Sequence, residues 1–406
     1  MTRRQLGVLL AGSHGLRGAS ALPPVRAVTK GPKFHWFGYY DKWQFDVQNR
    51  YVLGMQSGFE HRSPSPEDRI RVGMIDLKDN DRWIDLGESL AWGWQQGCML
   101  QWLPGSGTEI IWNDREDGQY VSRILDVKSG KKRTIGAPVY AISPDGSEAV
   151  APDFRRLHDL RPGYGYAGIA DPGREVAAPS DAGIWHTDLR SGKTRLILPF
   201  SQVAAIAAPG LDMANSRHWF NHLLYSPTGA RFIFLHRWQG KQHRTFQTRM
   251  FTAAKNAEDL FVLDPHGKTS HFIWRDPQNV LAWAWHPSQG DKFYLYKDKT
   301  SEVQAIGAGV MTVNGHCTYL PGLQNRWILN DTYPDKERLQ HVYLYDTASE
   351  KRIALGDFLS PPEYAGEWRC DTHPRFSRDG KSVVIDSTHE GKGRQLYLID
   401  VGAVVG

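Results

Sequence analysis

The sequence predicts an all-β fold, a seven-bladed β-propeller made of four-stranded antiparallel blades. Two recurring phrases indicate this fold. In the first, an apolar strand runs into a turn containing Pro or Gly and a second apolar strand follows, at 140–146, 224–229, 284–290, 317–322 and 373–380. In the second, an apolar run ends in an aspartate. Short strands that recur about every 50 residues are typical of propellers.

The strands that end in aspartate mark the individual blades. Clear ends occur at Asp76, Asp126, Asp188, Asp264, Asp346 and Asp400, and 294–298 supplies a weaker seventh unit. Several of these ends lead into Gly-containing turns, which join antiparallel strands tightly. We expect the strand-like segment 34–41 to pair with the last strands, near 383–386 and 396–400, because a closed ring leaves no open sheet edge.

The first 30 residues lie outside the repeats, and residues 31–406 are predicted to form one propeller domain. Paired arginines precede a short apolar run within 2–12, and 19–21 offers a small-residue cleavage site. This segment resembles a twin-arginine export signal and predicts a periplasmic or secreted protein, with a cytoplasmic location as the alternative. No run of about 18 apolar residues is present, so no membrane span is predicted.

Composition narrows the class of partner. The net charge is +5 and there is no long Lys/Arg run, which argues against nucleic acid and suits an anionic saccharide or polysaccharide. The 15 Trp and 16 Tyr fill the spaces between blades or stack on sugar rings. Three cysteines are too few for a disulfide framework, and the odd number leaves at least one free. The sequence does not predict an oligomeric state.

Two segments combine into a candidate metal site. His316 precedes one strand, and Cys370 and His373, three residues apart, precede another. A thiolate and two imidazoles suit a borderline divalent ion, so we expect zinc, with calcium or manganese as alternatives. Asp371 or a water molecule would complete the site. In the alternative interpretation, the histidines cap strand ends and the cysteines are buried core residues.

A second cluster of polar residues belongs to the fourth blade. The segment from Arg217 to His222 precedes one predicted strand, and His236 and Arg237 end the next. A histidine can act as a general base near neutral pH, and an arginine can hold a carboxylate through two parallel hydrogen bonds. Structural hydrogen bonding at strand ends is the alternative.

Weaker candidates lie at other strand ends and in one long loop. Gln96 and Asn113 place amides in the second blade, Tyr140 and Arg156 belong to the third, and Tyr164 lies in the long loop 154–185. Such side chains suit a sugar that carries hydroxyl and carboxylate groups. The sequence contains no Gly-x-Ser-x-Gly elbow, no phosphate-binding loop and no dinucleotide fingerprint. Among the acidic residues Asp41, Asp114, Asp331 and Asp371, no pair stands out for glycoside hydrolysis.

Four motifs together resemble a known family. They are Phe37-Gly-Tyr-Tyr-Asp41, Trp94-Gln-Gln-Gly97, Gly315-His-Cys317 with Asn330-Asp-Thr-Tyr-Pro334, and His373-Pro-Arg-Phe-Ser-Arg-Asp-Gly380. This combination is similar to the seven-bladed propeller polysaccharide lyases, which include oligogalacturonate lyases, ulvan lyases and rhamnosyl-glucuronate lyases. The resemblance covers about residues 33–400.

The resemblance implies β-elimination at a uronic acid, with rhamnose-glucuronate linkages as the expected substrate class. Tyr140 and Arg156 have the sixteen-residue spacing of a Tyr/Arg pair in the ulvan-type site, which makes Tyr140 the expected base or acid. Arg156 and Arg217 would hold the carboxylate, and His222 and His236 would assist proton transfer or bind sugar. The resemblance also implies the metal ligands His316, Cys370 and His373. The polar residues Gln96, Asn113, Tyr164 and Arg237, together with His35, are the expected substrate-binding residues.

One departure keeps alternatives open. The ulvan-type enzymes use two histidines in the early blades, whereas this chain has no histidine between His61 and His158 and offers amides there. An amide cannot act as a general base. An α-L-rhamnosidase that depends on His35, or a glycan-binding propeller without catalysis, therefore stands beside the lyase hypothesis.

Overall fold

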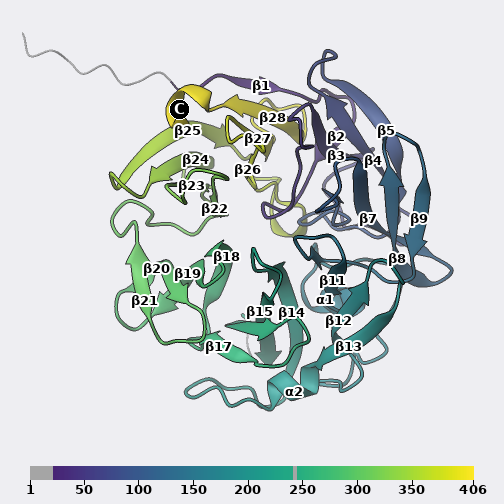
Figure 1. Cartoon of the computed structure of the whole chain (residues 1–406), viewed down its shortest axis with the longest axis vertical. Coiled ribbons are helices and arrows are strands. Elements are labelled where there is room, and N and C mark those ends of the chain that lie inside the picture. Colours follow the sequence, from purple (N-terminus) through teal and green to yellow (C-terminus); the bar gives the residue numbers. More distant parts are fainter. Residues whose placement is uncertain (1–21, 241–244) are drawn as a thin grey trace, which may run out of the picture.

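The computed structural model describes residues 22–240 and 245–406 of the chain. These residues form seven four-stranded antiparallel sheets arranged in a ring around a central axis (Figure 1). The predicted seven-bladed propeller is therefore confirmed. The export-signal-like segment falls largely on residues 1–21, outside the described residues, and remains a prediction.

The strand bounds follow the chain from blade to blade. The first blade contains β2 (Phe34–Trp36), β3 (Tyr51–Ser57), β4 (Ile70–Asp76) and β5 (Arg82–Ser89). The second contains β6 (Gln101–Trp102), β7 (Glu109–Glu116), β8 (Gln119–Asp126) and β9 (Lys132–Ile135). The third contains β10 (Ala141–Ile142), β11 (Glu148–Ala151), β12 (Gly183–Asp188) and β13 (Thr194–Pro199). The fourth contains β14 (Ser216–Tyr225), β15 (Arg231–Gly240), β16 (Gln247–Ala254) and β17 (Phe261–Asp264).

The remaining blades complete the ring. The fifth contains β18 (Thr269–Asp276), β19 (Asn279–His286), β20 (Gly290–Lys297) and β21 (Val303–Ile306). The sixth contains β22 (Thr318–Tyr319), β23 (Trp327–Asn330), β24 (Leu339–Asp346) and β25 (Lys351–Leu359). The seventh contains β26 (Arg375–Phe376), β27 (Ser382–Ser387), β28 (Gln395–Asp400) and the N-terminal strand β1 (Val25–Ala27).

Ring closure differs from the expectation in detail. Strand β1 pairs antiparallel with β28, so the outermost strand of the seventh blade comes from the start of the described chain. The expected closing segment 34–41 instead begins with β2, which pairs with β3 of the first blade. The propeller therefore includes residues 25–27, and the domain boundary expected at residue 31 lies too late in the chain.

Large aromatic side chains fill the spaces between blades. Trp36, Trp92 and Trp94 pack against one another with ring centroids 5.0–5.7 Å apart, and all three are buried. All three cysteines are free and buried. For these residues, the interpretation as core is the one that the structure supports.

At four of its five occurrences, the recurring Pro-Gly phrase forms the turn from an inner strand to the second strand of a blade. The fifth occurrence, at 284–290, instead joins β19 to β20, the second and third strands of the fifth blade. Gly146 has φ +72°, and a Cβ there would lie 2.1 Å from the carbonyl oxygen of Pro104, so the turn after β10 requires glycine. Because the inner strands all run in the same direction, the turns after them gather at one end of the central channel. We call this the turn end, and the opposite end, where the inner strands begin, the entry end.

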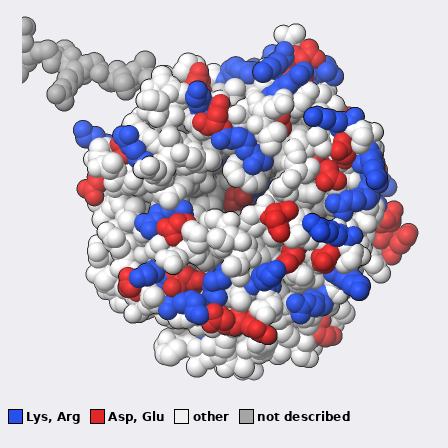
Figure 2. All heavy atoms as spheres, viewed as in Figure 1, with Lys and Arg blue, Asp and Glu red and all other residues white. Residues whose placement is uncertain are grey.

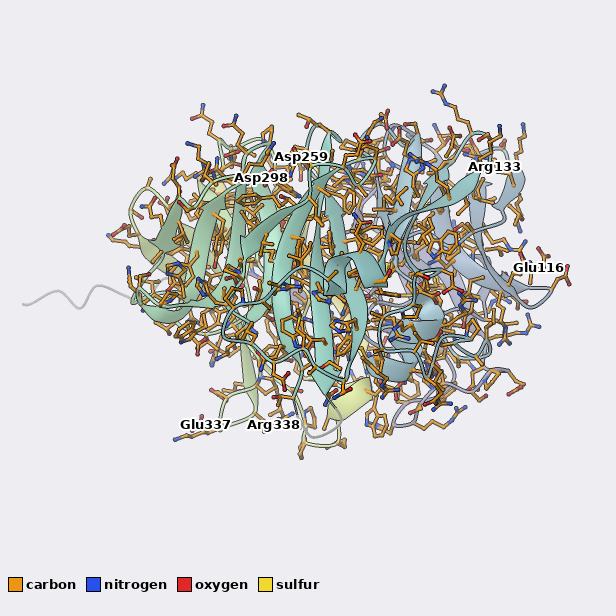
Figure 3. The ribbon with its side chains drawn as sticks, turned by 90° about the horizontal axis from the view of Figure 1, so that it is seen from below. Glu116, Arg133, Asp259, Asp298, Glu337 and Arg338 are labelled. Atoms are coloured by element: carbon orange, nitrogen blue, oxygen red, sulfur yellow. The ribbon has the colours of Figure 1, made fainter. Side chains whose placement is uncertain are left out.

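Figure 3 shows both ends from the side. The β23–β24 loop with Glu337 and Arg338 projects at the entry end, and the turns that carry Asp259 and Asp298 lie at the turn end. In the view of Figure 2, the ring has a hollow at its centre, and the acidic and basic side chains are interspersed around it.

Short helices occupy the two long loops. Helix α1 (Phe154–Leu160) begins at Asp153, whose side chain accepts hydrogen bonds from the first backbone N–H groups, and α2 (Phe200–Ala204) follows β13. A 3₁₀ turn at Gly366–Trp368 and α3 (Gly402–Val405) lie near the end of the chain. Among the described residues, no helix is long and apolar enough to span a membrane.

Candidate active site at the entry end of the channel

Histidine and tyrosine side chains from different blades meet at the entry end. His222 lies on β14 and His271 on β18, while His316 and His373 precede β22 and β26. The ring centroids of His316 lie 4.0 Å from His271 and 4.2 Å from His373, and those of His222 and His271 are 6.1 Å apart. Segments separated by 150 residues thus contribute to one cluster.

The segment 37–43 crosses the channel beside this cluster. It interrupts the inner strand of the first blade, which pairs with β3 through β2 and again at Phe45. Tyr39 stacks on His222 with a centroid distance of 4.8 Å, and its hydroxyl is hydrogen-bonded to Nδ1 of that ring. The Tyr40 hydroxyl donates to the carbonyl of Phe272 at 2.7 Å and accepts from its N–H at 3.0 Å. These contacts tie the first blade to the fourth and fifth across the axis.

The same segment separates the cluster from the turn end. There the channel continues as a cavity of about 520 Å³ lined by inner strands and by Tyr40, Asp41 and Lys42. None of the histidines among the described residues lines this cavity. The chemistry of the entry end is therefore confined to one side of the segment 37–43.

Three of the side chains form a group with metal-ligand character. One ligand atom each from His316, Asp371 and His373 lies within 4.8 Å of the others, and all three residues are buried. The Nδ1 atom of His316 lies 3.0 Å from both carboxylate oxygens of Asp331, so that this contact orients the ring. Thr372 donates to the same carboxylate at 2.5 Å. A carboxylate behind a histidine is the usual support of a metal ligand.

The expected ligand Cys370 needs correction. It is not part of this group, which contains Asp371 instead. Burial raises the pKa of the Cys370 thiol, and the nearby charges of Arg394, Asp386, Glu60 and Asp371 also act on it. Successive side chains of an extended segment point to opposite sides, so Cys370 and Asp371 cannot both face the channel.

Two histidines of the cluster have strained backbones. His222 has φ +52° and His373 has φ +40°, a region that non-glycine residues rarely adopt. At His222, the pairing of β14 with β15 shifts register, and the backbone N–H bonds to the side chain of Asn221 at 2.9 Å. Such strain, kept in place by its surroundings, is common at functional sites.

Burial holds the imidazoles of His222, His271 and His373 neutral. Burial, followed by the nearby positive charge of Arg237, lowers the pKa of His222 well below its ordinary value. Burial has the same effect on the pKa of His271 and of His373. Neutral imidazoles are the form that binds a metal ion or accepts a proton.

Arg237 brings an unpaired positive charge to the cluster. Only 4% of its surface is exposed, and its Nε and Nη1 atoms have no hydrogen-bond partner among the residues that the structure describes. Burial lowers the pKa of Arg237 to about 9, with the charge of Arg161 adding to the shift. The group therefore remains charged at neutral pH, and its free N–H groups can receive an anion.

Two tyrosines complete the site. The Tyr140 hydroxyl accepts a hydrogen bond of 2.7 Å from Gln96, and burial keeps its pKa well above the ordinary value. The Tyr164 hydroxyl accepts from Arg369 at 2.7 Å. Burial alone would raise the pKa of Tyr164, but the charges of Arg369, Arg161 and Arg237 outweigh burial and lower it. The two phenols thus differ in acidity.

The structure places several predicted site residues elsewhere. Arg156 is buried next to α1 and donates to Asp171 and to the carbonyls of His218, Gly173, Val176 and Ala177. Its guanidinium is saturated by these structural bonds, so it cannot hold a substrate carboxylate as expected. Arg217 lies close enough to Arg156 for its charge to lower the pKa of that group, and no described contact joins it to the histidine cluster.

His236 is also committed to structure. Its Nδ1 accepts from Arg249 at 3.2 Å and its Nε2 therefore donates to Nδ1 of His218 at 2.9 Å. With both nitrogens engaged inside the fourth blade, it cannot assist proton transfer at the channel.

Asn113 and His35 have structural partners as well. The amide of Asn113 bonds to both backbone groups of Val139 and to the hydroxyl of Tyr166. His35 bonds to Gln395 at 3.0 Å and to Gln56 at 2.8 Å, in the first blade away from the cluster. The structure therefore places neither residue in the histidine cluster, and a rhamnosidase that depends on His35 would need a site in the separate pocket that His35 lines with Gln56 and Trp83.

Sequence reasoning missed several members of the site. Tyr39, His271 and Arg369 were not singled out, and Arg161 was noted only as part of a loop. His271 precedes the apolar part of an inner strand as His316 does, so a comparison of the blades position by position could have found it. Nothing in the sequence indicates that the segment 37–43 crosses the channel.

The comparisons with known proteins bear on the fold. No family model matches the sequence, and no curated protein matches it. Among solved structures, an oligogalacturonate lyase from Vibrio parahaemolyticus is similar over 93% of both chains, with 13% identity and a TM-score of 0.64. An oligogalacturonate lyase in complex with manganese is similar over 94% of both chains, with 14% identity and a TM-score of 0.66. This chain shares its fold with oligogalacturonate lyase.

Other propellers show that the fold alone does not decide activity. The tricorn protease is similar over 92% of this chain and 34% of its own, with 12% identity and a TM-score of 0.54. Function must therefore be argued from the side chains at the entry end.

Proposed function

We propose that this protein is a polysaccharide lyase that cleaves a uronic-acid-containing glycan by β-elimination. The observation that carries the proposal is the buried guanidinium of Arg237, whose Nε and Nη1 have no partner, beside neutral histidines and tyrosines. A buried charge without a partner is costly unless a ligand compensates it. A uronate carboxylate has the charge and the planar geometry to do so.

His271 is the proposed base that removes the C5 proton of the uronate. Asn314 donates its amide N–H to Ser270, so its oxygen accepts from Nδ1 of His271 at 3.1 Å. This bond places the ring proton on Nδ1 and leaves Nε2 as the proton acceptor. His222 is a weaker candidate for the base, because Tyr39 stacks on its ring and is hydrogen-bonded to its Nδ1.

Tyr140 is the proposed acid that protonates the leaving oxygen at C4. Its raised pKa keeps the phenol protonated at neutral pH, which favours the role of acid over that of base. Gln96 donates to the phenol oxygen, so the hydroxyl proton points away from Gln96 and is available for transfer. His271 and Tyr140 thereby divide the two proton transfers that the sequence analysis left open.

A divalent ion fits the group of His316, Asp371 and His373. Two imidazoles and a carboxylate suit manganese, and the thiolate on which the expectation of zinc depended is not in the group. Bound there, the ion would stabilise the negative charge that develops on the uronate carboxylate. The manganese-bound oligogalacturonate lyase with the same fold supports this choice.

The proposed substrate is a glycan with rhamnose-glucuronate linkages, which the sequence motifs favour, and oligogalacturonate is the alternative that the structural similarity favours. The test is the rise in ultraviolet absorbance from the unsaturated uronate product on each glycan with added Mn²⁺. Arg237→Gln should lower kcat/KM at least 100-fold, since a charged hydrogen bond in a buried site contributes about 3 kcal/mol or more. Arg190→Gln on the exposed β12–β13 turn is the matched control. Full activity of Arg237→Gln would exclude the proposed role of this residue.

A further inference from the structure

Three arginines surround Tyr164 at the entry end, and only one of them has an acidic partner. Arg369 donates to Asp371 at 2.8 Å and to the Tyr164 hydroxyl. Arg161 lies over the Tyr164 ring at 4.9 Å, and Arg237 lies near enough for its charge to act on the phenol. No described carboxylate pairs with Arg161 or Arg237.

Arg161 and Arg237 also contact one phenyl ring. The guanidinium carbons lie 4.9 Å and 4.7 Å from the centroid of Phe246. The buried Nε atom of Arg161 lacks a hydrogen-bond partner, as do Nε and Nη1 of Arg237. Arg161 itself is half-buried, so a ligand at the channel mouth can reach it. Two like charges are thus held together with free N–H groups.

Other buried arginines of this protein show what a structural role looks like. Arg156 donates to five oxygen acceptors, and Arg394 donates to Glu60 and to the carbonyl of Trp368. Among the described residues, Arg161 and Arg237 have no such set of oxygen acceptors. The two positive charges repel each other, so an acceptor oxygen near them would stabilise the protein more than it would stabilise a lone arginine. Stacking on Phe246 attracts each guanidinium to the ring face but does not satisfy the N–H groups.

We propose that Arg161 forms a second anion-binding subsite, which receives a carboxylate or sulfate ester on the sugar next to the reacting uronate. The inference rests on the proposed function, in which Arg237 holds the reacting carboxylate. The protein would then select glycans that carry anionic groups on adjacent sugars over glycans with a single isolated uronate. A carboxylate and a sulfate ester share the chemistry that this subsite needs, since a guanidinium binds the oxygens of either anion through paired hydrogen bonds.

Calorimetric binding tests this subsite without depending on turnover. The protein with Mn²⁺ carries His271→Gln so that the ligand is not consumed. The probes are trigalacturonate, a sulfated rhamnose-glucuronate tetrasaccharide containing a single uronate, and the same tetrasaccharide after desulfation. The added Arg161→Gln change should weaken binding of whichever multiply charged probe binds, trigalacturonate or the sulfated tetrasaccharide, by about tenfold. It should weaken binding of the desulfated probe less than twofold. Loss confined to trigalacturonate identifies a carboxylate as the second anion, and loss confined to the sulfated probe identifies a sulfate.

Two further variants serve as controls. Arg174→Gln removes a charge from an exposed arginine that contacts Asp159 outside the channel, and it should leave all affinities unchanged. Arg161→Lys keeps the charge without the paired donors and should restore part of the affinity. Thermal melting of each variant reports whether it is folded.

The outcomes separate the subsite from the proposed function. Equal weakening of all probes by Arg161→Gln, or no weakening, overturns the subsite even if wild-type protein cleaves uronate glycans. Charge-dependent binding without any cleavage by the wild-type protein supports the subsite and contradicts the lyase proposal.

Discussion

Asp331 shows how one residue can set the geometry of the candidate metal group. It contacts His316 through both the ring nitrogen and the backbone N–H, and it accepts from Thr372 on the neighbouring segment. A single carboxylate therefore positions residues from the two segments that supply the ligands. Its side chain lies behind the histidine and not among the ligand atoms.

We expect Asp331→Asn to weaken Mn²⁺ binding by about 10-fold to 100-fold, because an amide supports the imidazole less strongly than a carboxylate does. Titration calorimetry with Mn²⁺ measures the change. Asp335→Asn is the control, since that carboxylate lies on the same β23–β24 loop and binds His341 at the surface. Unchanged affinity in Asp331→Asn would show that Asp331 serves the fold alone.

The sequence predicted the types of residue that gather at the entry end, namely histidine, tyrosine and arginine. It was less successful in predicting which individual residues of those types lie there. Arg156 and Arg237 are both buried arginines, and only the fold decides that carbonyls of the segment 173–177 saturate the first. Likewise, Cys370 and Asp371 are neighbours, and a shift of one residue decides which faces the histidines. Spacing along the chain cannot resolve either case.

The hairpin of β14 and β15 contributes both to the site and to the stability of the fourth blade. One face carries the chain of hydrogen bonds from Arg249 through His236 to His218. Nδ1 of His218 accepts a hydrogen bond from Nε2 of His236 and cannot be protonated without breaking that bond. The buried hairpin is therefore sensitive to pH.

Protein stability should fall as the pH drops from about 6.5 toward 4. Burial, with the charges of Arg156 and Arg249, lowers the pKa of His218 to about 4 from an ordinary 6.5. Between these values the unfolded chain binds a proton that the folded chain does not, so acid favours unfolding. Across this range, the free energy of unfolding should depend less steeply on pH in His218→Gln than in the wild-type protein. The slopes should differ by up to about one proton bound on unfolding. An identical slope in the variant would contradict this account.

At the scale of elements, the period and the turns predicted the blades, because short buried strands recur along the chain and most blades have a glycine-containing turn after the inner strand. The sequence did not reveal that the segment 37–43 leaves the inner strand and crosses the channel. Gly38 allows this path, since it has φ +93° and a Cβ there would lie 3.0 Å from the backbone of Gln96. The contacts that hold the segment across the channel, from Tyr39 to His222 and from Tyr40 to Phe272, involve the fourth and fifth blades, which no local pattern records.

The ring as a whole depends on the pairing of its first and last strands. β1 adds three residues to the edge of β28, and two backbone bonds flank it: Val28 donates to Leu396 at 2.9 Å, and Asp400 donates to Pro24 at 3.1 Å. Without β1, the edge of β28 would be exposed, and exposed edges favour association between chains. Closure by β1 thus links the fold of the seventh blade to the start of the described chain.

Removal of β1 should destabilise the whole propeller. A chain that starts at residue 28 is expected to melt roughly 5 °C below one that starts at residue 22, because it loses several backbone hydrogen bonds of about 1 kcal/mol each. Thermal unfolding followed by circular dichroism gives the comparison. Equal melting temperatures would show that β1 does not contribute to closure.

The proposed function depends on the entry end of this ring acting as one site on a uronate glycan. Mass spectrometry of the products formed by the wild-type protein tests that claim most directly. β-Elimination breaks the C4–O bond without adding water, so the masses of the two fragments should sum to that of the substrate, and one fragment should carry the unsaturated uronate. Fragments that together contain one additional water molecule would identify a hydrolase and contradict the account.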